Sequence, residues 1–301
     1  MDQLAAMRVF VRVVETGNFS RAAIALNMPK TTVTNLIQGL EAHLRTTLLN
    51  RTTRRVMVTT DGALYYERAS QIISEIDELD GSLSNSQAQP SGRLRVEMAG
   101  AFADLVVIPS LCDFHSRHPQ IQIDLGVGDR LVDYMAENVD CALRAGTPTD
   151  QSLIARKISE IAMVTCASPV YLEKMGMPTT PEEMAEGRHF AVGYLQAQAG
   201  RILPMGFSRD GETRDIVPQY VISANDARSY LTAALTGLGV AQLPLFMVRE
   251  ALADGRLIRV LPMWQHEPLP LYVVYPQTRH LSNKVRVFVN WLVGLMRDID
   301  K

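Results

Sequence analysis

Apolar side chains recur at helical spacing at the start of the chain. This spacing predicts a first helix over residues 4–16, whose apolar positions are Met7, Phe10, Val11 and Val14. Gly17 ends that helix, and Ser20 is a good N-cap for a second, short helix that runs to residue 26. Asn27 supplies a turn, and Pro29 favours the first turn of a third helix. The pattern indicates three short helices in the first 45 residues.

The third helix has two different faces. One face carries an apolar stripe of Val33, Ile37, Leu40 and Leu44. The other is polar with mostly short side chains, as a helix needs in order to enter the major groove of DNA. Segments 47–51 and 55–59 then read as a hairpin with Thr52, Thr53 and Arg54 at its tip, and basic groups on such a ribbon suit phosphates or a minor groove.

These features favour a winged helix-turn-helix that binds double-stranded promoter DNA. A three-helix bundle without a nucleic-acid role is the alternative, and the basic hairpin argues against it. The charge distribution agrees with DNA binding, because residues 1–60 carry eight basic and three acidic groups while the whole chain has a net charge of −2. The side chains expected to contact DNA are Ser20, Lys30, Thr31, Thr32, Thr34, Asn35, Gln38, Arg51, Thr52, Arg54 and Arg55.

A long helix is predicted over residues 61–84, with Thr60 as its cap. Its apolar positions follow a heptad period, and the expected dimer seam is Tyr65, Ala69, Ile72, Ile76, Leu79 and Leu83. Residues 61–90 contain six acidic groups and one basic group, so DNA repels this helix. Dimerisation is favoured over packing against the chain's own C-terminal region. Residues 87–92 read as a hinge.

From residue 93 onward, strand and helix patterns alternate. Strands are expected at 94–98, 121–125, 141–144, 161–166 and 271–275, and helices at 105–115, 131–137 and 283–296. Alternation of this kind predicts a two-lobed α/β region, with chain crossings near 161–165 and 269–272. The expected domains are 1–60 for DNA binding, 61–91 for the linker helix and hinge, and 92–301 for the C-terminal domain. Within the last, lobe I takes 92–162 and 269–301, and lobe II takes 163–268.

The chain shows no catalytic constellation. His115 and His118 lie near a helix end without a third metal ligand, and no glycine-rich phosphate loop or nucleophile elbow occurs. We therefore expect no enzyme activity, no metal and no cofactor. The chain has an odd number of cysteines, Cys112, Cys141 and Cys166. We expect them to be buried thiols of a protein in a reducing compartment.

Neither end of the chain reads as a membrane or export segment. The start lacks the continuous apolar region of a secretory signal, and residues 288–296 are too short to cross a bilayer. A cytoplasmic protein without a membrane partner is expected. Two other classes stay open, namely an enzyme with an added DNA-binding head and a periplasmic solute receptor.

Several motifs resemble the LysR family of transcriptional regulators. In the N-terminal part they are Gly17-Asn18-Phe19-Ser20-Arg21-Ala22-Ala23, Leu40-Glu41, Leu48-Leu49-Asn50-Arg51-Thr52-Thr53-Arg54 and Thr59-Thr60-Asp61-Gly62. In the C-terminal part they include Asp140-Cys141-Ala142-Leu143-Arg144-Ala145-Gly146, Ala167-Ser168-Pro169-Val170-Tyr171-Leu172 and Gly237-Leu238-Gly239-Val240-Ala241-Gln242-Leu243-Pro244. Thr34 and Asn35 stand where many relatives have a serine–arginine pair, so Asn35 or Gln38 is expected to pair with adenine in place of an arginine–guanine contact.

The resemblance implies a periplasmic-binding-protein-like effector domain, with a small polar or anionic organic effector between its lobes. It also implies dimers that assemble into tetramers, and contact with RNA polymerase. The candidate effector residues are Gly100, Ala101, Phe102, Asp129, Arg144, Tyr194, Asn225, Asp226 and Gln242. Arg144 suits a carboxylate, which an arginine binds bidentately. The alternatives are a structural ion pair for Arg144 and a helix-capping role for Asn225 and Asp226.

Overall fold

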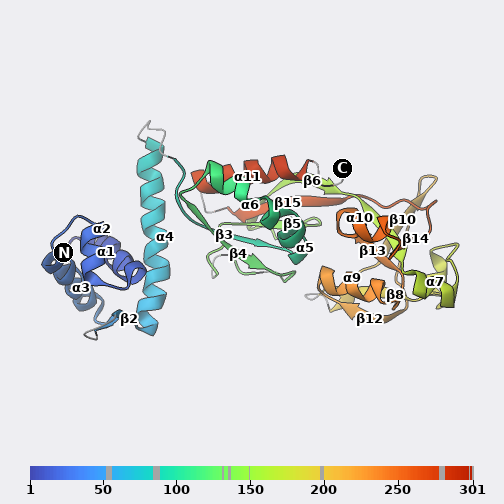
Figure 1. Ribbon diagram of the computed structural model, residues 1–301, viewed down its shortest axis with the longest axis horizontal. Coiled ribbons are helices and arrows are strands. Elements are labelled where there is room, and N and C mark those ends of the chain that lie inside the picture. Colours follow the sequence, from blue (N-terminus) through green and yellow to red (C-terminus); the bar gives the residue numbers. More distant parts are fainter. Residues whose placement is uncertain are drawn as a thin grey trace. The chain divides into compact units, whose positions relative to one another are not determined.

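The protein is described from a computed structural model. The structure describes residues 1–51, 56–83, 89–130, 132–134, 137–148, 150–196, 200–277, 282–297 and 299. The chain divides into two compact units, Met1–Ala88 and Gln89–Lys301 (Figure 1). The long helix thus belongs to the first unit.

The first unit is three helices, a small hairpin and one long helix. Its elements are α1 (Gln3–Thr16), α2 (Phe19–Ala25), α3 (Lys30–Leu44), β1 (Leu49–Arg51), β2 (Val56–Val58) and α4 (Thr60–Leu83). The expected apolar stripes meet in one core, where Phe10, Val33, Ile37 and Leu40 are fully buried. The core exists because each of the short helices is amphipathic and can bury its apolar face only against the others.

Two expected helix caps are wrong by one or two residues. Asn18 caps α2 in place of Ser20, and its Oδ1 accepts hydrogen bonds from the backbone N–H groups of Ser20 and Arg21 at 2.8 and 3.2 Å. Thr59 caps α4 in place of Thr60, because its hydroxyl oxygen accepts from the Gly62 N–H at 2.9 Å. In both cases a polar residue further upstream reaches the free amides at the helix start.

The second unit begins with a five-stranded sheet, here called lobe I. Its strand order is β4-β3-β5-β15-β6, in which β3, β4 and β5 are parallel and β15 is antiparallel to both neighbours. The strands are β3 (Gly92–Met98), β4 (Ile121–Val127), β5 (Cys141–Ala145), β6 (Leu153–Ile161) and β15 (Leu269–Pro276).

Helices complete lobe I on one face of its sheet. They are α5 (Gly100–Phe102), a π-helical turn η1 (Ala103–Val107), α6 (Ile108–Arg117) and α11 (Asn283–Met296). The helix expected over 105–115 is therefore longer, since helical structure begins directly after β3 at Gly100. The helix expected over 131–137 is wrong for the residues described there, of which Tyr134 and Glu137 lie in turns and Val132 and Asp133 in no regular element. Val132 and Tyr134 in this segment pack on the other face of the sheet.

Lobe II is built from smaller sheets. The strand orders are β12-β8-β9 and β13-β7-β14, beside a β10-β11 hairpin. The strands are β7 (Met163–Ala167), β8 (Ala191–Gln196), β9 (Arg201–Ile202), β10 (Met205–Arg209), β11 (Glu212–Ile216), β12 (Tyr220–Ala224), β13 (Ala241–Pro244) and β14 (Ile258–Arg259). The helices are α7 (Pro169–Met175), α8 (Glu182–Ala185), α9 (Ala227–Leu235) and α10 (Leu245–Ala253).

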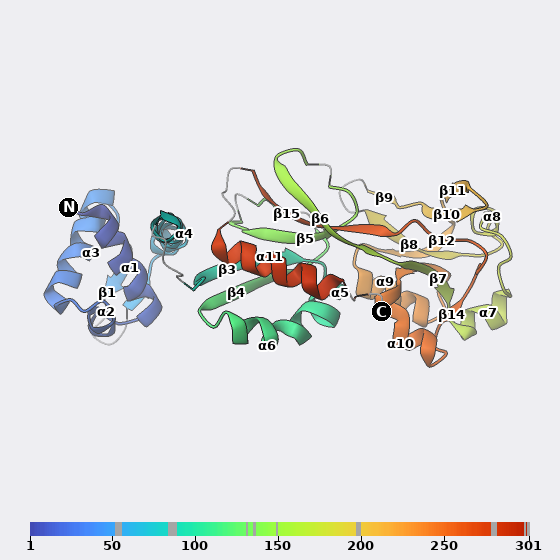
Figure 2. The same cartoon turned by 90° about the horizontal axis from the view of Figure 1, so that it is seen from above.

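The two lobes of the second unit share apolar contacts. The chain passes from β6 into β7 at Ala162, and it returns to lobe I in β15. The Phe102 ring of lobe I stacks on the Phe246 ring of lobe II with centroids 5.2 Å apart. Ala101 lies in the lobe II core, and α5 lies beside α9 in both views (Figure 2). The start of α5 is therefore fixed against lobe II.

Within the described residues, no helix combines the length and the apolar character needed to cross a membrane.

Candidate functional site

The third helix presents its polar face to solvent. Val33, Ile37 and Leu40 on its inner face are fully buried. The outer face consists of exposed Lys30, Thr31, Thr32, Asn35 and Gln38. An exposed row of amide and hydroxyl groups can donate and accept hydrogen bonds along a groove of DNA. The fold thus brings together the base-reading residues expected from the sequence.

Thr34 differs from its neighbours on this helix. Its side chain is half-buried, and its hydroxyl donates to the carbonyl oxygen of Lys30 one turn earlier at 3.0 Å. This internal bond occupies the hydroxyl hydrogen, so Thr34 offers less to a base than Asn35 does.

A glutamate fixes the hairpin to the third helix. Glu41 Oε1 accepts from the backbone N–H groups of Leu48 and Leu49 at 2.9 and 3.1 Å. Apart from its place in the Leu40-Glu41 motif, sequence reasoning gave Glu41 no role. The bonds set where β1 starts relative to α3. Arg51 ends β1, and its side chain lies outside the described residues, as do Thr52, Arg54 and Arg55.

The expected dimer seam on α4 divides into two parts. Ala69 is 1% exposed, and the Tyr65 ring packs edge-on against Phe10 of α1 with centroids 5.5 Å apart. Burial raises the pKa of the Tyr65 hydroxyl. These two residues pack within their own unit, and their place in a dimer seam stays a prediction. Ile72 is 44% exposed and Ile76 is half-buried, while the side chains of Leu79 and Leu83 lie outside the described residues.

A carboxylate joins the two lobes of the second unit. Asp129, just after β4, accepts from the Tyr194 hydroxyl at 3.1 Å and from the Ala227 N–H at 3.0 Å, both through Oδ2. Tyr194 lies in β8, and Ala227 is the first residue of α9. Asp226 caps the same helix, accepting from the Ser229 N–H at 2.7 Å. The capping role expected as one alternative for Asp226 is therefore present.

Gly100 lies directly beside this carboxylate group. A side-chain carbon at Gly100 would lie 3.7 Å from Arg228 Cδ and 4.0 Å from Asp226 Oδ2. Arg228 itself pairs with Asp104 of lobe I at 2.7 Å, a second polar bridge that sequence reasoning missed. Burial raises the pKa of Tyr194, and the negative charges of Asp129 and Asp226 raise it further. The structure thus groups Gly100, Asp129, Tyr194 and Asp226 around the start of α9.

Arg144 lies near the carboxyl end of β5. Its Nε donates to the Tyr134 hydroxyl at 3.3 Å, and its Nη2 is buried without a hydrogen-bond partner. The described contacts of Arg144 do not include the ion pair that was considered as an alternative for it. A guanidinium with a free buried N–H can still donate a hydrogen bond to an anionic group.

The other expected effector residues have different surroundings. Ala101 and Phe102 are 3% and 4% exposed and serve as packing between the lobes. Asn225 is exposed. The Gln242 amide Nε2 donates to the Gly206 carbonyl oxygen at 2.8 Å and lies 2.7 Å from His266 Nδ1, within lobe II. These residues are thus not all part of one cluster.

Thiols and metal-binding groups give no further site in the described residues. Cys141 and Cys166 are buried, and burial raises the pKa of both thiols, that of Cys166 to about 12. Cys112 is exposed, which corrects the expectation that it is buried. No group of three or more possible metal ligands occurs among the residues described.

The chain is similar to known proteins along almost its full length. A family model described as a bacterial regulatory helix-turn-helix protein of the lysR family matches residues 4–63, and one for the LysR substrate binding domain matches residues 87–297. The HTH-type transcriptional regulator YhjC of Escherichia coli is 40% identical over 301 residues, covering 99% of both chains. An HTH-type transcriptional repressor of Pseudomonas aeruginosa is 37% identical, with 99% of this chain and 93% of that protein covered.

Solved structures agree with the sequence relatives. CrgA, a LysR-type regulator from Neisseria meningitidis, has a TM-score of 0.60 at 30% identity and covers 99% of both chains. The full-length virulence activator AphB of Vibrio cholerae has a TM-score of 0.58 at 29% identity, with 97% of this chain and 99% of that chain covered. With both family models matched in order and full-length relatives of the same two-part architecture, this chain belongs to the LysR family of transcriptional regulators, with a helix-turn-helix DNA-binding domain and an effector-binding domain.

Proposed function

We propose that α3 reads bases in the major groove through Asn35 and Gln38. The observation that carries this proposal is the exposed polar face of α3, whose opposite face is fully buried in the core. Each of these amides can pair bidentately with adenine, which presents an acceptor and a donor in the major groove. Thr31, Thr32 and Thr34 add shorter contacts on the same face.

The phosphate contacts belong to the residues around that helix. Ser20 and Lys30 lie at the exposed starts of α2 and α3. No side chain caps α3, so the backbone amides of its first turn also favour phosphate oxygens. Arg51, Thr52, Arg54 and Arg55 of the hairpin supply further hydrogen-bond donors, most of them charged. With a net charge of +5 over residues 1–60, the binding constant should fall steeply as salt rises, because counterions are released from DNA.

The C-terminal domain is proposed to bind its effector between lobes I and II. The hydrogen bonds of Asp129 to both Tyr194 and Ala227 support this position, because a ligand there contacts groups of both lobes. The parallel strands β3, β4 and β5 have their carboxyl ends at the edge of lobe I where Asp129 follows β4. The carboxyl ends of strands are the usual ligand position in open α/β sheets. The proposal includes no catalytic step.

Assembly and location follow from the same regulatory role. We expect α4 to pair with α4 of a second copy, so that two DNA-binding units can reach two half-sites, and we expect dimers to form tetramers. Contact with RNA polymerase is part of the proposal, and the protein acts in the cytoplasm, where promoter DNA is.

A binding-site scan tests the division between base and phosphate contacts. Asn35→Ala and Gln38→Ala should each lose about 1–3 kcal/mol at particular base pairs and little at others. Arg51→Ala should weaken binding to every duplex by a similar factor and lower the salt dependence by about one unit of slope. The measurement is fluorescence anisotropy with a library of single-base variants of the promoter site.

Ser208→Ala is the matched control, because this lobe II residue lies outside the DNA-binding unit. It should leave DNA affinity and sequence preference unchanged. If Asn35→Ala and Gln38→Ala lower binding equally at all sequences, the assignment of base reading to α3 is wrong. Wild-type protein that binds its promoter no better than an arbitrary duplex would contradict regulation itself.

A further inference from the structure

Three helices of lobe II begin or end around one hollow. The hollow has a volume of about 400 Å³, which lies in the range of about 300–1,000 Å³ that is typical of small-molecule sites. Its lining residues come from the start of α7, the end of α9 and the turn after α10, and they are Ser168, Pro169, Val170, Leu235, Gly255 and Arg256. All three helices belong to lobe II (Figure 1). The hollow is therefore built by a single lobe.

Two glycine turns explain why this space is not filled by side chains. Gly237 follows α9 with φ +86° and Gly255 follows α10 with φ +78°, a left-handed conformation that favours glycine after a helix. A side-chain carbon at Gly255 would meet nothing within 4 Å, whereas one at Gly237 would lie 3.4 Å from both Ser168 Oγ and Val170 Cγ1. The end of α9 thus packs closely on the start of α7, and the turn after α10 leaves the space open.

The walls of the hollow are anchored in the core of the lobe. Ser168 is 1% exposed, and its Oγ accepts from the Tyr171 N–H at 3.3 Å. Beyond Gly255, Leu257 is also 1% exposed, and its N–H donates to the Ala251 carbonyl oxygen at 2.8 Å. Walls that are already fixed lower the entropy cost of binding a ligand.

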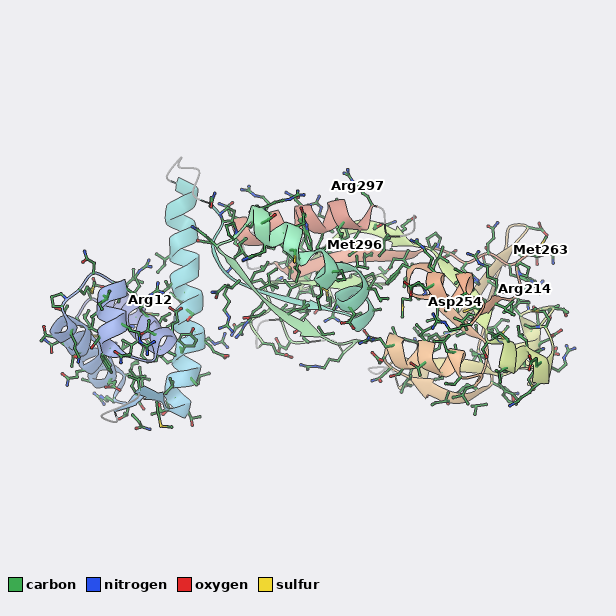
Figure 3. All side chains as sticks on the ribbon, in the orientation of Figure 1. Arg12, Arg214, Asp254, Met263, Met296 and Arg297 are labelled. Atoms are coloured by element: carbon green, nitrogen blue, oxygen red, sulfur yellow. The ribbon has the colours of Figure 1, made fainter. Side chains whose placement is uncertain are left out.

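The lining combines apolar surface with one guanidinium group. Pro169, Val170 and Leu235 are apolar, and Val170 is 49% exposed. Arg256 is held by Asp254, which directly follows α10 (Figure 3). Asp254 Oδ2 accepts from Arg256 Nε at 2.7 Å, and its Oδ1 accepts from the Arg256 backbone N–H at 3.2 Å. Both Nη groups of Arg256 stay outside these bonds, so they can donate to a further acceptor.

We propose that this hollow binds a small organic acid, in which an apolar body carries one carboxylate. The apolar body packs on Pro169, Val170 and Leu235, and its burial adds affinity in proportion to the area removed from water. The carboxylate accepts from the Nη groups of Arg256. Hydrogen bonds between an arginine and a carboxylate are stronger than those to a neutral acceptor, which favours an acid over an alcohol of the same size.

This site is separate from the proposed effector position between the lobes. Leu235 is the last residue of α9, and Ala227, whose N–H donates to Asp129, is the first. The nine residues of α9 place its two ends about 12 Å apart. The inference therefore goes beyond the proposed function, and either site can exist without the other.

The first experiment compares acids with alcohols on the full-length protein. The acids are phenylacetate, phenylpropionate and octanoate, and each alcohol has the carbon skeleton of its acid. Calorimetry measures the dissociation constants. We expect each acid to bind about 10- to 100-fold more tightly than its alcohol, the range for a hydrogen bond to a charged group.

The second experiment locates the site with two variants. Arg256→Gln removes the charge and should weaken binding of the tightest acid by about 10-fold or more. Val170→Phe places a larger side chain in the lining, so it should weaken binding of the same acid by competing for the space. Because Val170 is 49% exposed, the lobe should fold with the larger side chain.

Arg188→Gln and Val221→Phe are matched controls in the same lobe. Arg188 is an exposed arginine that pairs with Glu186 two positions earlier, as Arg256 pairs with Asp254. Val221 is 63% exposed and lies on β12, away from the lining. Both controls should leave the affinity for the acid unchanged, and circular dichroism checks that every variant is folded.

Three results would overturn the inference. An acid that binds the wild type, Arg256→Gln and Val170→Phe equally occupies another position, which refutes this site and leaves effector binding between the lobes standing. Equal affinity for acid and alcohol would show that the carboxylate is not recognised. Binding of none of the three acids would mean that the hollow is not a site for small organic acids.

Discussion

At the scale of single residues, several polar side chains of lobe II form hydrogen-bond contacts with residues that are far away in the sequence. Thr165 is 1% exposed, and its hydroxyl lies 3.0 Å from His266 Nε2. On the other side of the ring, Nδ1 lies 2.7 Å from the Gln242 amide nitrogen. Nδ1 also lies 2.9 Å from the Gly206 carbonyl oxygen, which accepts from Gln242 Nε2 as well. Gln242, expected at the effector site, thus belongs to a polar cluster around His266 within lobe II.

This arrangement predicts acid sensitivity. Burial lowers the pKa of His266 below its ordinary value of about 6.5. The unfolded chain therefore binds the proton more readily than the folded protein, so the free energy of unfolding should fall as pH drops below about 6.5. Urea unfolding at pH 7.5 and at pH 5.5 measures the difference. In His266→Gln the loss of stability between these two pH values should be smaller.

Two comparisons make this prediction specific. His43→Gln, an exposed residue of α3, should keep the wild-type pH dependence. His189 has its pKa lowered by burial as well, so part of the effect should persist in His266→Gln. If the variant and the wild type lose equal stability, the protonation of His266 does not contribute.

At the scale of elements, α4 packs within its own unit along its first turns and is proposed to contact a second copy beyond them. Its first turns complete the core of the DNA-binding unit through Tyr65 and Ala69. Gly62 permits this close approach, because a side-chain carbon there would lie 2.1 Å from the Leu48 carbonyl oxygen. The heptad period predicts one continuous seam along α4. The first turns of α4, however, already use the face with Tyr65 and Ala69 to pack within the DNA-binding unit. The surface proposed for a second copy therefore begins around Ile72, which is 44% exposed.

We therefore expect Ile72→Asp and Ile76→Asp to weaken self-association. Each change places an unpaired charge in an apolar helix contact, which costs several kcal/mol when the contact forms. Since Ile72 is 44% exposed, its replacement should leave the folded unit intact. Light scattering coupled to size exclusion measures the oligomer over a range of concentrations.

Ile24→Asp is the control for this prediction, because Ile24 is also apolar and 82% exposed but lies on α2. It should keep the wild-type oligomer. An unchanged oligomer in both Ile72→Asp and Ile76→Asp would mean that self-association does not use α4.

At the scale of the whole molecule, regulation requires that effector binding and DNA binding influence one another. The effector-binding unit has its own contacts between lobes, through Asp129, the Arg228–Asp104 pair and the Phe102–Phe246 stack. A ligand that alters those contacts changes the balance between arrangements of the lobes. Such coupling between two sites is typically about 1–3 kcal/mol.

The expected outcome is a reciprocal change in affinity. An effector that changes promoter affinity by about 5- to 150-fold must have its own affinity changed by the same factor when the DNA is bound. Calorimetry of effector binding to free protein and to the protein–DNA complex measures one arm, and anisotropy with and without effector measures the other. Equal effector affinity in both states would rule out equilibrium regulation of DNA binding by that compound.

The sequence by itself determined the local elements and the family. Helices α1, α4 and α11 lie within a residue or so of their expected bounds, and α3 begins directly after Pro29 as expected. An amphipathic period and nearby caps are local properties of the chain. The helix-turn-helix and the alternating α/β pattern likewise depend on neighbouring residues, and the motifs that carry the LysR resemblance are short and continuous. These features could be predicted without knowing any distant contact.

Only the tertiary structure decided how the candidate site residues are partnered. Asp129 and Tyr194 are 65 positions apart and Thr165 and His266 are 101 apart, and no local pattern relates them. The same holds for Tyr65 and Ala69, whose heptad positions suit a dimer seam as well as they suit packing on α1. A side chain's partner depends on which distant segments the fold brings beside it. That is why the polarity of these residues was evident from the sequence, whereas the hydrogen-bond partners of Asp129 and Arg144 were not.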